Sequence, residues 1–218
     1  LRYYTPGRGY HTTTPDDRDG SAFGIAVATL DGNRHTAGDC AVPFAIQSIS
    51  KIFTYALALE DHGREYVLSR VGVEPSGDSF SSIVFDERAK RPYNPMVNAG
   101  ALVAADLVKG ADRAEKQQRL LDLMRRHAGN DDLDVDWNVA EREISSDDRN
   151  RATAYLLRSE GMIDGEVEEV LALYLQQCSV TATCNDLAMM AATLANGGIN
   201  PLTGERAYTE RYLRDVLT

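Results

Sequence analysis

The sequence has few of the residues that mark metal-binding or disulfide-stabilised proteins. Its 218 residues include only three cysteines and four histidines. The cysteines, Cys40, Cys178 and Cys184, are odd in number and lack the spacing of metal ligands, and the histidines lie far apart. This pattern favours reduced thiols in a cytoplasmic protein, and it predicts neither a metal site nor another cofactor.

Basic residues and long apolar runs are also scarce. The chain has 23 Lys and Arg against 33 Asp and Glu, a formal net charge of −10. Sequence-independent binding to nucleic acid or to anionic lipid needs clustered positive charge, so this balance argues against both. No segment has the apolar length of a membrane span, and no signal peptide opens the chain. We therefore expect a small-molecule substrate, with no nucleic-acid or membrane partner.

The composition that remains is typical of a globular protein, with 43% hydrophobic and 26% charged residues. Residues 1–22 are rich in Gly, Pro, Thr and Asp, which predicts a loosely ordered N-terminal lead-in. The chain begins with Leu1 rather than methionine. We expect it to be part of a longer protein.

Strand signals are confined to the N-terminal side. Residues 23–30 form a small apolar run, the turn signal Asp31-Gly32-Asn33 follows, and residues 34–37 can return as a second strand. No later segment predicts a convincing strand. Because one hairpin is not a stable sheet, this count leaves the sheet incomplete.

From Ser48 onward the pattern is mainly helical. Helices are predicted over residues 49–61, 64–71, 98–108, 114–127, 149–159, 166–178 and 185–195. Residues 73–95 are predicted to form a long loop, and long ordered loops in compact domains often border a site.

The most informative motif is Ser48-x-x-Lys51. Residues three apart share a helix face, so the serine hydroxyl and the lysine amine can approach each other. A lysine surrounded by apolar residues loses affinity for its proton, and the neutral amine can then activate a serine. The alternative is an ordinary amphipathic helix with Lys51 in water. Apolar residues around the motif, including Ile49, Ile52 and Phe53, favour the buried lysine.

Seven segments together resemble the serine-dependent glutaminases, which share the fold of β-lactamases and penicillin-binding proteins. They are FGIA (23–26), QSISK (47–51), VGVEPSGD (71–78), NPMVNAGA (94–101), RNRA (149–152), YLQQCS (174–179) and LANGGINP (194–201). The resemblance implies an α+β fold of the β-lactamase/DD-peptidase type, with an antiparallel sheet beside a mainly helical cluster. Residues 23–218 would be the catalytic domain without its C-terminal strands, since the family continues past the equivalent of Thr218.

The resemblance also implies the chemistry. Ser48 would attack the side-chain amide of L-glutamine, Lys51 would take the serine proton, and Tyr174 would help to relay it. Ammonia and an acyl-enzyme would form, and water would then release L-glutamate. Family members usually form homodimers or homotetramers, so we expect a homo-oligomer.

The substrate-binding residues follow from the same resemblance. Glu143 would accept the α-ammonium group of glutamine through a charge-assisted hydrogen bond. Asn98, Asn150 and Gln47 would hold polar ends of the substrate together with Ser48. Tyr4 matches an N-terminal tyrosine that closes over the ligand, although its spacing to residue 23 is longer than usual.

Each of these residues has an ordinary structural alternative. Asn98 could be a helix N-cap, Glu143 could lie on a solvated face, and Asn150 and Tyr174 could be satisfied polar groups at the edge of the core.

Two alternative functions also remain. One is an acyltransferase acting on lactams or peptides, which the absence of a Ser-Asp-Asn motif disfavours. The other is a catalytically silent domain of the same ancestry that binds an amino acid or builds an oligomer.

Overall fold

The computed structural model describes residues 22–218, so Tyr4 and nearly all of the predicted lead-in lie outside the described residues. The predicted hairpin is confirmed. Strands β1 (Gly24–Ala28) and β2 (Arg34–Gly38) pair antiparallel, with Gly24 opposite Gly38 and Ala28 opposite Arg34. The turn closes through Thr29, whose N–H donates to the carbonyl of Asn33 at 2.9 Å.

A second small sheet was missed by the sequence analysis. It has the order β3 (Phe44–Ala45), β5 (Val180–Ala182) and β4 (Asp134–Val135), and its pairs are antiparallel. The expectation of no strand after the hairpin is therefore wrong at β3, β4 and β5. These strands are two and three residues long, too short to show an alternating pattern.

The predicted helices are confirmed to within two residues at nearly every end. The helices of the described residues are α1 (Lys51–His62), α2 (Arg64–Arg70), α3 (Asn98–Asp106), α4 (Arg113–Ala128), α5 (Trp137–Ser146), α6 (Asp148–Ser159), α7 (Val167–Cys178), α8 (Cys184–Ala195) and α9 (Leu213–Leu217), with short 3-10 turns η1 (Gln47–Ser50) and η2 (Glu210–Tyr212). Helices α5 and α9 were not predicted. The predicted loop 73–95 is present, with only an isolated bridge between Asp86 and Arg91.

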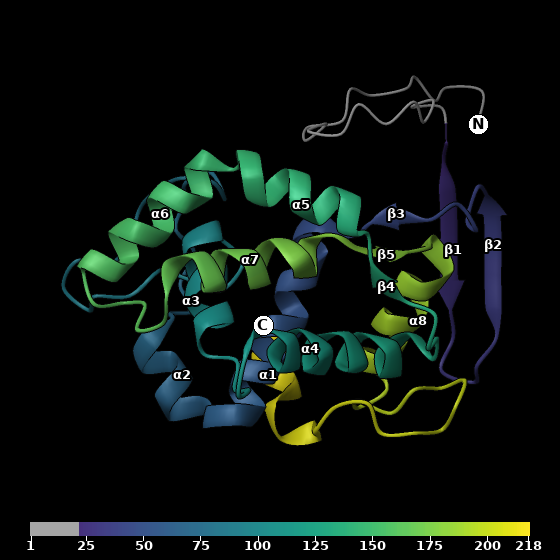
Figure 1. Ribbon diagram of the computed structural model, residues 1–218. Coiled ribbons are helices and arrows are strands. Elements are labelled where there is room, and N and C mark those ends of the chain that lie inside the picture. The colour runs from purple at the N-terminus through teal and green to yellow at the C-terminus, as the bar shows by residue number, and fades with distance from the viewer. Residues whose placement is uncertain (1–21) are drawn as a thin grey trace.

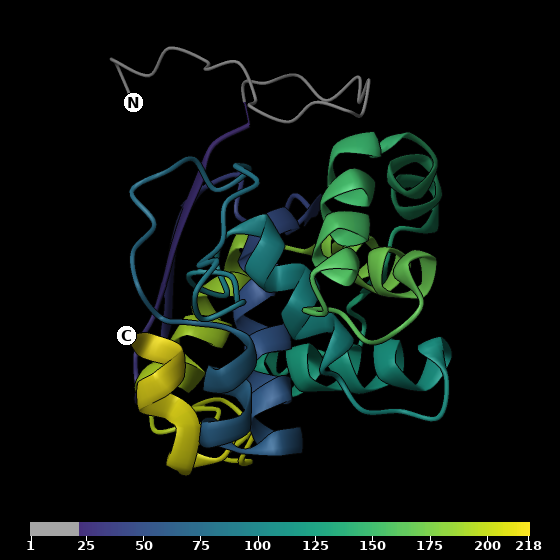
Figure 2. The same ribbon diagram turned by 90° about the vertical axis from the view of Figure 1, so that its left-hand side faces the viewer.

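The helices form the main core, and the hairpin lies at its edge. In Figures 1 and 2 the hairpin and α6 lie at opposite sides of the molecule, with α1 and α3 between them. Helix α7 packs against α3, α4, α5 and α6, and α8 covers one face of β1. Leu59, Leu102, Leu123 and Leu171 are fully buried at the centre. The protein therefore has an α+β architecture, as predicted.

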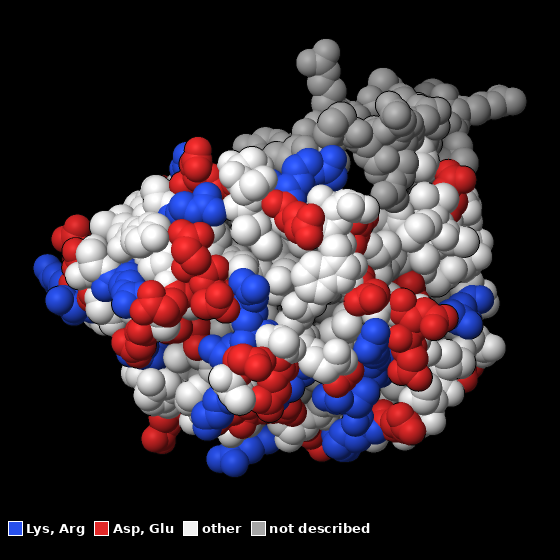
Figure 3. Space-filling view, in the orientation of Figure 1, with Lys and Arg blue, Asp and Glu red and all other residues white. Residues whose placement is uncertain are grey.

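Charge of both signs is present on the face of the molecule seen in Figure 3. Acidic and basic side chains intermingle on the face that Figure 3 shows. Within residues 22–218, no helix has the length and apolar character to cross a membrane.

The loop that precedes α3 packs closely against the helix at Gly100. A Cβ atom at Gly100 would lie 1.9 Å from the carbonyl oxygen of Asn94 and 3.1 Å from the Cα of Pro95. Alanine normally stabilises a helix interior by about 1 kcal/mol relative to glycine. We expect Gly100→Ala instead to lower the free energy of unfolding by about 2 kcal/mol, because the backbone of Asn94 would have to move to make room for the Cβ atom. Urea denaturation measures this change, and a stabilised variant would contradict it.

His127 is buried without a partner for its Nε2 atom among the described residues, while its Nδ1 lies 2.8 Å from the carbonyl of Leu123. Burial lowers the pKa of His127 to about 4. His127 in the unfolded chain therefore binds a proton near pH 6.5, whereas His127 in the folded protein binds one only near pH 4. The contribution of His127 to the free energy of unfolding is therefore complete above pH 6.5. It decreases by about 3 kcal/mol as the pH drops to 4.

His127→Phe should remove this part of the pH dependence. The free energy of unfolding, measured from pH 7 to pH 4 in both proteins, should fall less steeply in the variant. Parallel curves would mean that His127 titrates normally.

Candidate active site

The Ser48–Lys51 segment joins strand β3 to helix α1. Ser48 lies in the 3-10 turn η1, and α1 begins at Lys51. Residues three apart eclipse each other in a 3-10 turn, so this geometry keeps the two side chains on one side. The Ile46 N–H donates to the Val180 carbonyl at 2.9 Å, and the Ser50 hydroxyl to the Gln47 carbonyl at 2.7 Å. The first bond ties the turn to strand β5 of the small sheet, and the second closes the turn on itself.

Lys51 is a buried lysine, as predicted, and the alternative of Lys51 in water is wrong. Its side chain is 2% exposed, and Nζ donates to the Met96 carbonyl at 3.0 Å and to Asn98 Oδ1 at 2.6 Å. Nζ also lies 5.6 Å from the centre of the Phe80 ring. Burial lowers the pKa of Lys51, so the neutral amine is more populated at a given pH than in an exposed lysine.

Ser48 is exposed, and its hydroxyl has no hydrogen-bond partner among residues 22–218. As the second residue of η1, it lies where helical N–H groups lack intrahelical partners. Because Ser48 also lines a pocket, its hydroxyl and N–H are available to attack a substrate carbonyl and to bind its oxygen.

The two asparagines continue the hydrogen bonding from Lys51. Asn98 Nδ2 donates to Asn150 Oδ1 at 3.0 Å, and Asn150 Nδ2 donates to Asp147 Oδ2 at 2.6 Å. Asn98 is the first residue of α3, whose N-cap is Val97 without a side-chain cap, so the N-cap interpretation of Asn98 is wrong.

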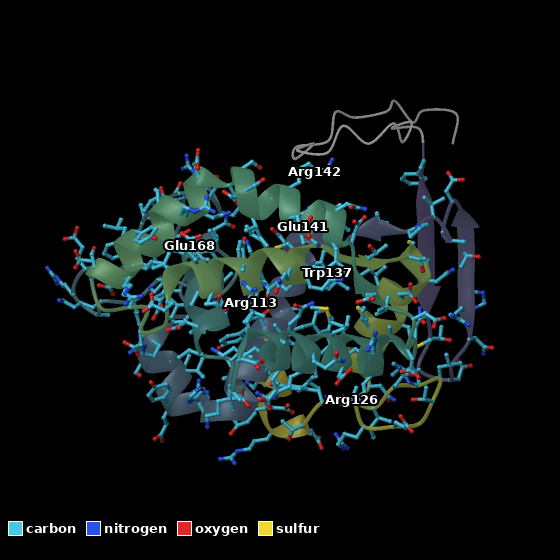
Figure 4. All side chains as sticks on the ribbon, viewed as in Figure 1. Arg113, Arg126, Trp137, Glu141, Arg142 and Glu168 are labelled. Carbon is cyan, nitrogen blue, oxygen red and sulfur yellow. The ribbon has the colours of Figure 1, made fainter. Side chains whose placement is uncertain are left out.

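Glu143 faces the site from helix α5. Its side chain is 8% exposed, and Oε1 accepts a hydrogen bond from Gln47 Nε2 at 2.9 Å. The solvated-face interpretation of Glu143 is therefore wrong. Trp137, Glu141 and Arg142 occupy the exposed face of α5 and are labelled in Figure 4.

Gln47 has a left-handed backbone, with φ of 49°. This region costs a residue with a Cβ about 1 kcal/mol or more, and such strain concentrates at functional sites. The strained residue directly precedes Ser48 and turns its own amide towards Glu143.

Tyr174 lies on helix α7 and is 3% exposed. Burial raises the pKa of Tyr174 well above its ordinary value, so the phenol holds its proton. Burial likewise raises the pKa of the neighbouring Cys178 thiol to about 12, so this thiol is unreactive.

These side chains surround a pocket of about 210 Å³. Its lining combines predicted and unpredicted residues: Gln47, Ser48, Phe80, Ser81, Asn98, Glu143, Ser146, Asp147, Arg149, Asn150, Tyr174, Leu175 and Cys178. Lys51 is not among the lining residues, but its Nζ donates to Asn98 Oδ1, and Asn98 does line the pocket.

Seven lining residues were not predicted as site residues: Phe80, Ser81, Ser146, Asp147, Arg149, Leu175 and Cys178. The first two lie in the long loop that was expected to border a site. Arg149 fixes this loop, since its guanidinium donates twice to the Ser81 carbonyl, at 3.0 and 2.8 Å. An Asp three residues before Asn150 is also a helix-start signal, which could have drawn attention to Asp147.

A family model described as "Glutaminase" matches residues 16–218. The chain belongs to the glutaminase family. A glutaminase of Trichormus variabilis is 55% identical over 196 residues, which cover 90% of this chain and 58% of that protein. A glutaminase of Clostridium botulinum is 46% identical over 202 residues, covering 92% and 66%. The chain thus spans little more than half the length of the first of these relatives.

Solved glutaminase structures have the same architecture. A Bacillus glutaminase structure is 37% identical with a TM-score of 0.84 and covers 88% of this chain and 65% of that one. A structure described as Mglu in its glutamate form is 44% identical with a TM-score of 0.84, and covers 92% and 46%.

The strain at Gln47 can be measured by comparing Gln47→Gly with Gln47→Ala. Both lose the bond to Glu143, but only alanine keeps a Cβ in the left-handed region. We expect the glycine variant to be more stable by about 1 kcal/mol.

The control pair is Ser145→Gly and Ser145→Ala, on the exposed face of α5, where alanine should be the more stable. The same order at both sites, measured by chemical denaturation, would exclude strain at Gln47.

Proposed function

We propose that residues 23–218 are the greater part of the catalytic domain of a glutaminase, which hydrolyses L-glutamine to L-glutamate and ammonia through an acyl-enzyme on Ser48. One observation carries the proposal: a buried lysine lies three residues after an exposed serine that lines a pocket. Membership of the glutaminase family selects glutamine as the substrate.

The reaction begins with deprotonation of Ser48. Lys51, as the neutral amine, takes the hydroxyl proton while Oγ bonds to the carboxamide carbon. The N–H of Ser48 binds the developing oxyanion. Tyr174 donates its phenolic proton towards the leaving nitrogen and is reprotonated from Lys51, so that the C–N bond breaks and ammonia leaves. Water then attacks the ester, and glutamate departs with Ser48 restored.

The pocket suits both ends of a glutamine zwitterion. The Glu143 carboxylate can accept from the α-ammonium group, and Gln47 keeps that carboxylate in place at 2.9 Å. The amides of Asn98 and Asn150 offer directional hydrogen bonds without a buried charge. A relative's structure is described as its glutamate form, which supports an amino-acid ligand here. Tyr4 stays a predicted ligand contact outside the described residues.

The finer fold assignment belongs to the same proposal. A β-lactamase/DD-peptidase-like fold would place the β1–β2 hairpin in a larger antiparallel sheet. Ile25 and Val27 on β1 are 53% and 52% exposed within residues 22–218, which supports a sheet that is incomplete here. Homodimeric or homotetrameric assembly and a cytoplasmic location stay predictions from the resemblance and the cysteine pattern.

Ser48→Ala should lower the rate of ammonia release from L-glutamine by about 10³-fold or more. Ser145→Ala is the matched control, because its hydroxyl bonds to the Arg142 carbonyl and lies outside the pocket. Both variants should be assayed in this chain and in a protein extended at the C-terminus to the length of the relatives. Activity that survives Ser48→Ala would refute the serine mechanism.

Activity absent from a folded, extended protein that still binds glutamate would instead identify a silent amino-acid-binding domain. Turnover of a chromogenic lactam, tested beside glutamine, separates the lactam-acting alternative.

A further inference from the structure

Asp147 lies at the far end of the hydrogen bonds that reach Lys51. It ends helix α5 and is the N-cap of α6. Oδ1 accepts from the Asn150 N–H at 3.0 Å, and Oδ2 accepts from Asn150 Nδ2 at 2.6 Å. Both oxygens therefore accept, as an ionised carboxylate does.

The Asp147 carboxylate determines the orientation of the Asn150 amide, and the Asn150 amide in turn determines that of Asn98. Because Asp147 can only accept, the NH₂ group of Asn150 must face it, and the Asn150 oxygen then faces Asn98. The Asn98 NH₂ group donates to that oxygen at 3.0 Å, which leaves its own oxygen facing Lys51 Nζ at 2.6 Å. Each amide dipole has its oxygen towards the lysine. Reversing either amide would oppose two donors.

We propose that Asp147 is a positioning residue that orients the Asn150 and Asn98 amides and so stabilises the charged form of the Lys51 amine in its buried place. The inference rests on the proposed function for its catalytic consequence, but the effect on Lys51 is a property of the fold. Nothing in the family resemblance assigns Asp147 a role.

The sign of the effect follows from the charges around Lys51. Burial lowers the pKa of Lys51. The Cys178 thiol on α7 has its own pKa raised to about 12 by burial, so it is uncharged where Lys51 titrates. Tyr174 on α7 and Glu143 on α5 are the other titratable groups of the pocket beside Asp147, and Arg149 is its cation. The aligned amides oppose the effect of burial, because their oxygens stabilise the ammonium form. Removing the carboxylate should therefore lower the pKa of Lys51 further.

Asp147→Asn tests this directly. An asparagine offers one acceptor oxygen where two are needed, so either the cap of α6 or the bond to Asn150 Nδ2 is lost. Asp147→Ser keeps a capping oxygen but has neither the charge nor the second acceptor. Asp148→Asn is the charge-matched control, because the Asp148 side chain is 97% exposed and its ion-pair contact is with Arg151 at 3.6 Å.

The readout is the titration of Lys51 by NMR in protein labelled at the lysine side chains. The sequence has only four lysines, and the Lys51 signal is assigned by its loss in Lys51→Met. We expect the pKa of Lys51 to fall by about one unit in Asp147→Asn and in Asp147→Ser, and to stay unchanged in Asp148→Asn. In an active protein, the acid limb of kcat/KM should move to lower pH, with about a 10- to 100-fold loss of kcat/KM.

An unchanged Lys51 titration in Asp147→Asn would overturn the inference, even if stability falls, and would leave Asp147 as a helix cap only. Equal shifts in Asp147→Asn and Asp148→Asn would also overturn it, because net charge alone would then explain them. A shifted titration in a protein that releases no ammonia would support the positioning role while refuting the proposed function.

Discussion

The buried amine of Lys51 is the interaction on which the site depends. A charged amine without water costs several kcal/mol unless strong acceptors replace the lost hydration. Here the acceptors are the Met96 carbonyl and Asn98 Oδ1, which come from the segment that enters α3. Gly100 lets the backbone of Asn94 and Pro95 lie against α3, so that this segment reaches the start of α1. The acceptors that Lys51 needs are therefore in place only when α1 packs against α3.

The pocket is also held together by groups that bind each other before any ligand arrives. Gln47 bonds to Glu143, and Asn98 bonds to Asn150. Arg149 fixes the carbonyl of Ser81 above the pocket. A site organised in this way loses little orientational freedom when a substrate binds, which is the usual source of catalytic precision on a rigid scaffold. The strained backbone of Gln47 is stabilised by the same contacts.

Parts of the fold were readable from local patterns. The hairpin was predicted because Asp31-Gly32-Asn33 separates two short apolar runs, and the long helices because their apolar residues repeat at helical spacing. Helix α5 was missed because charged residues cover its exposed face and the buried Glu143 reads as one more surface charge. Strands β4 and β5 were missed because they pair with distant segments and carry no period of their own.

The sequence by itself determined the chemistry that is available: a serine three residues before a lysine, amides and a carboxylate at spacings that match a family, and helices with apolar faces strong enough to bury the lysine. Only the tertiary structure decided which of these groups meet. The approach of Glu143 to Gln47, of Asn150 to Asn98 and of Asn98 to Lys51 depends on α1, α3, α5 and α6 packing together. Contacts between residues about 50 to 100 positions apart are properties of packing, and no local pattern encodes them.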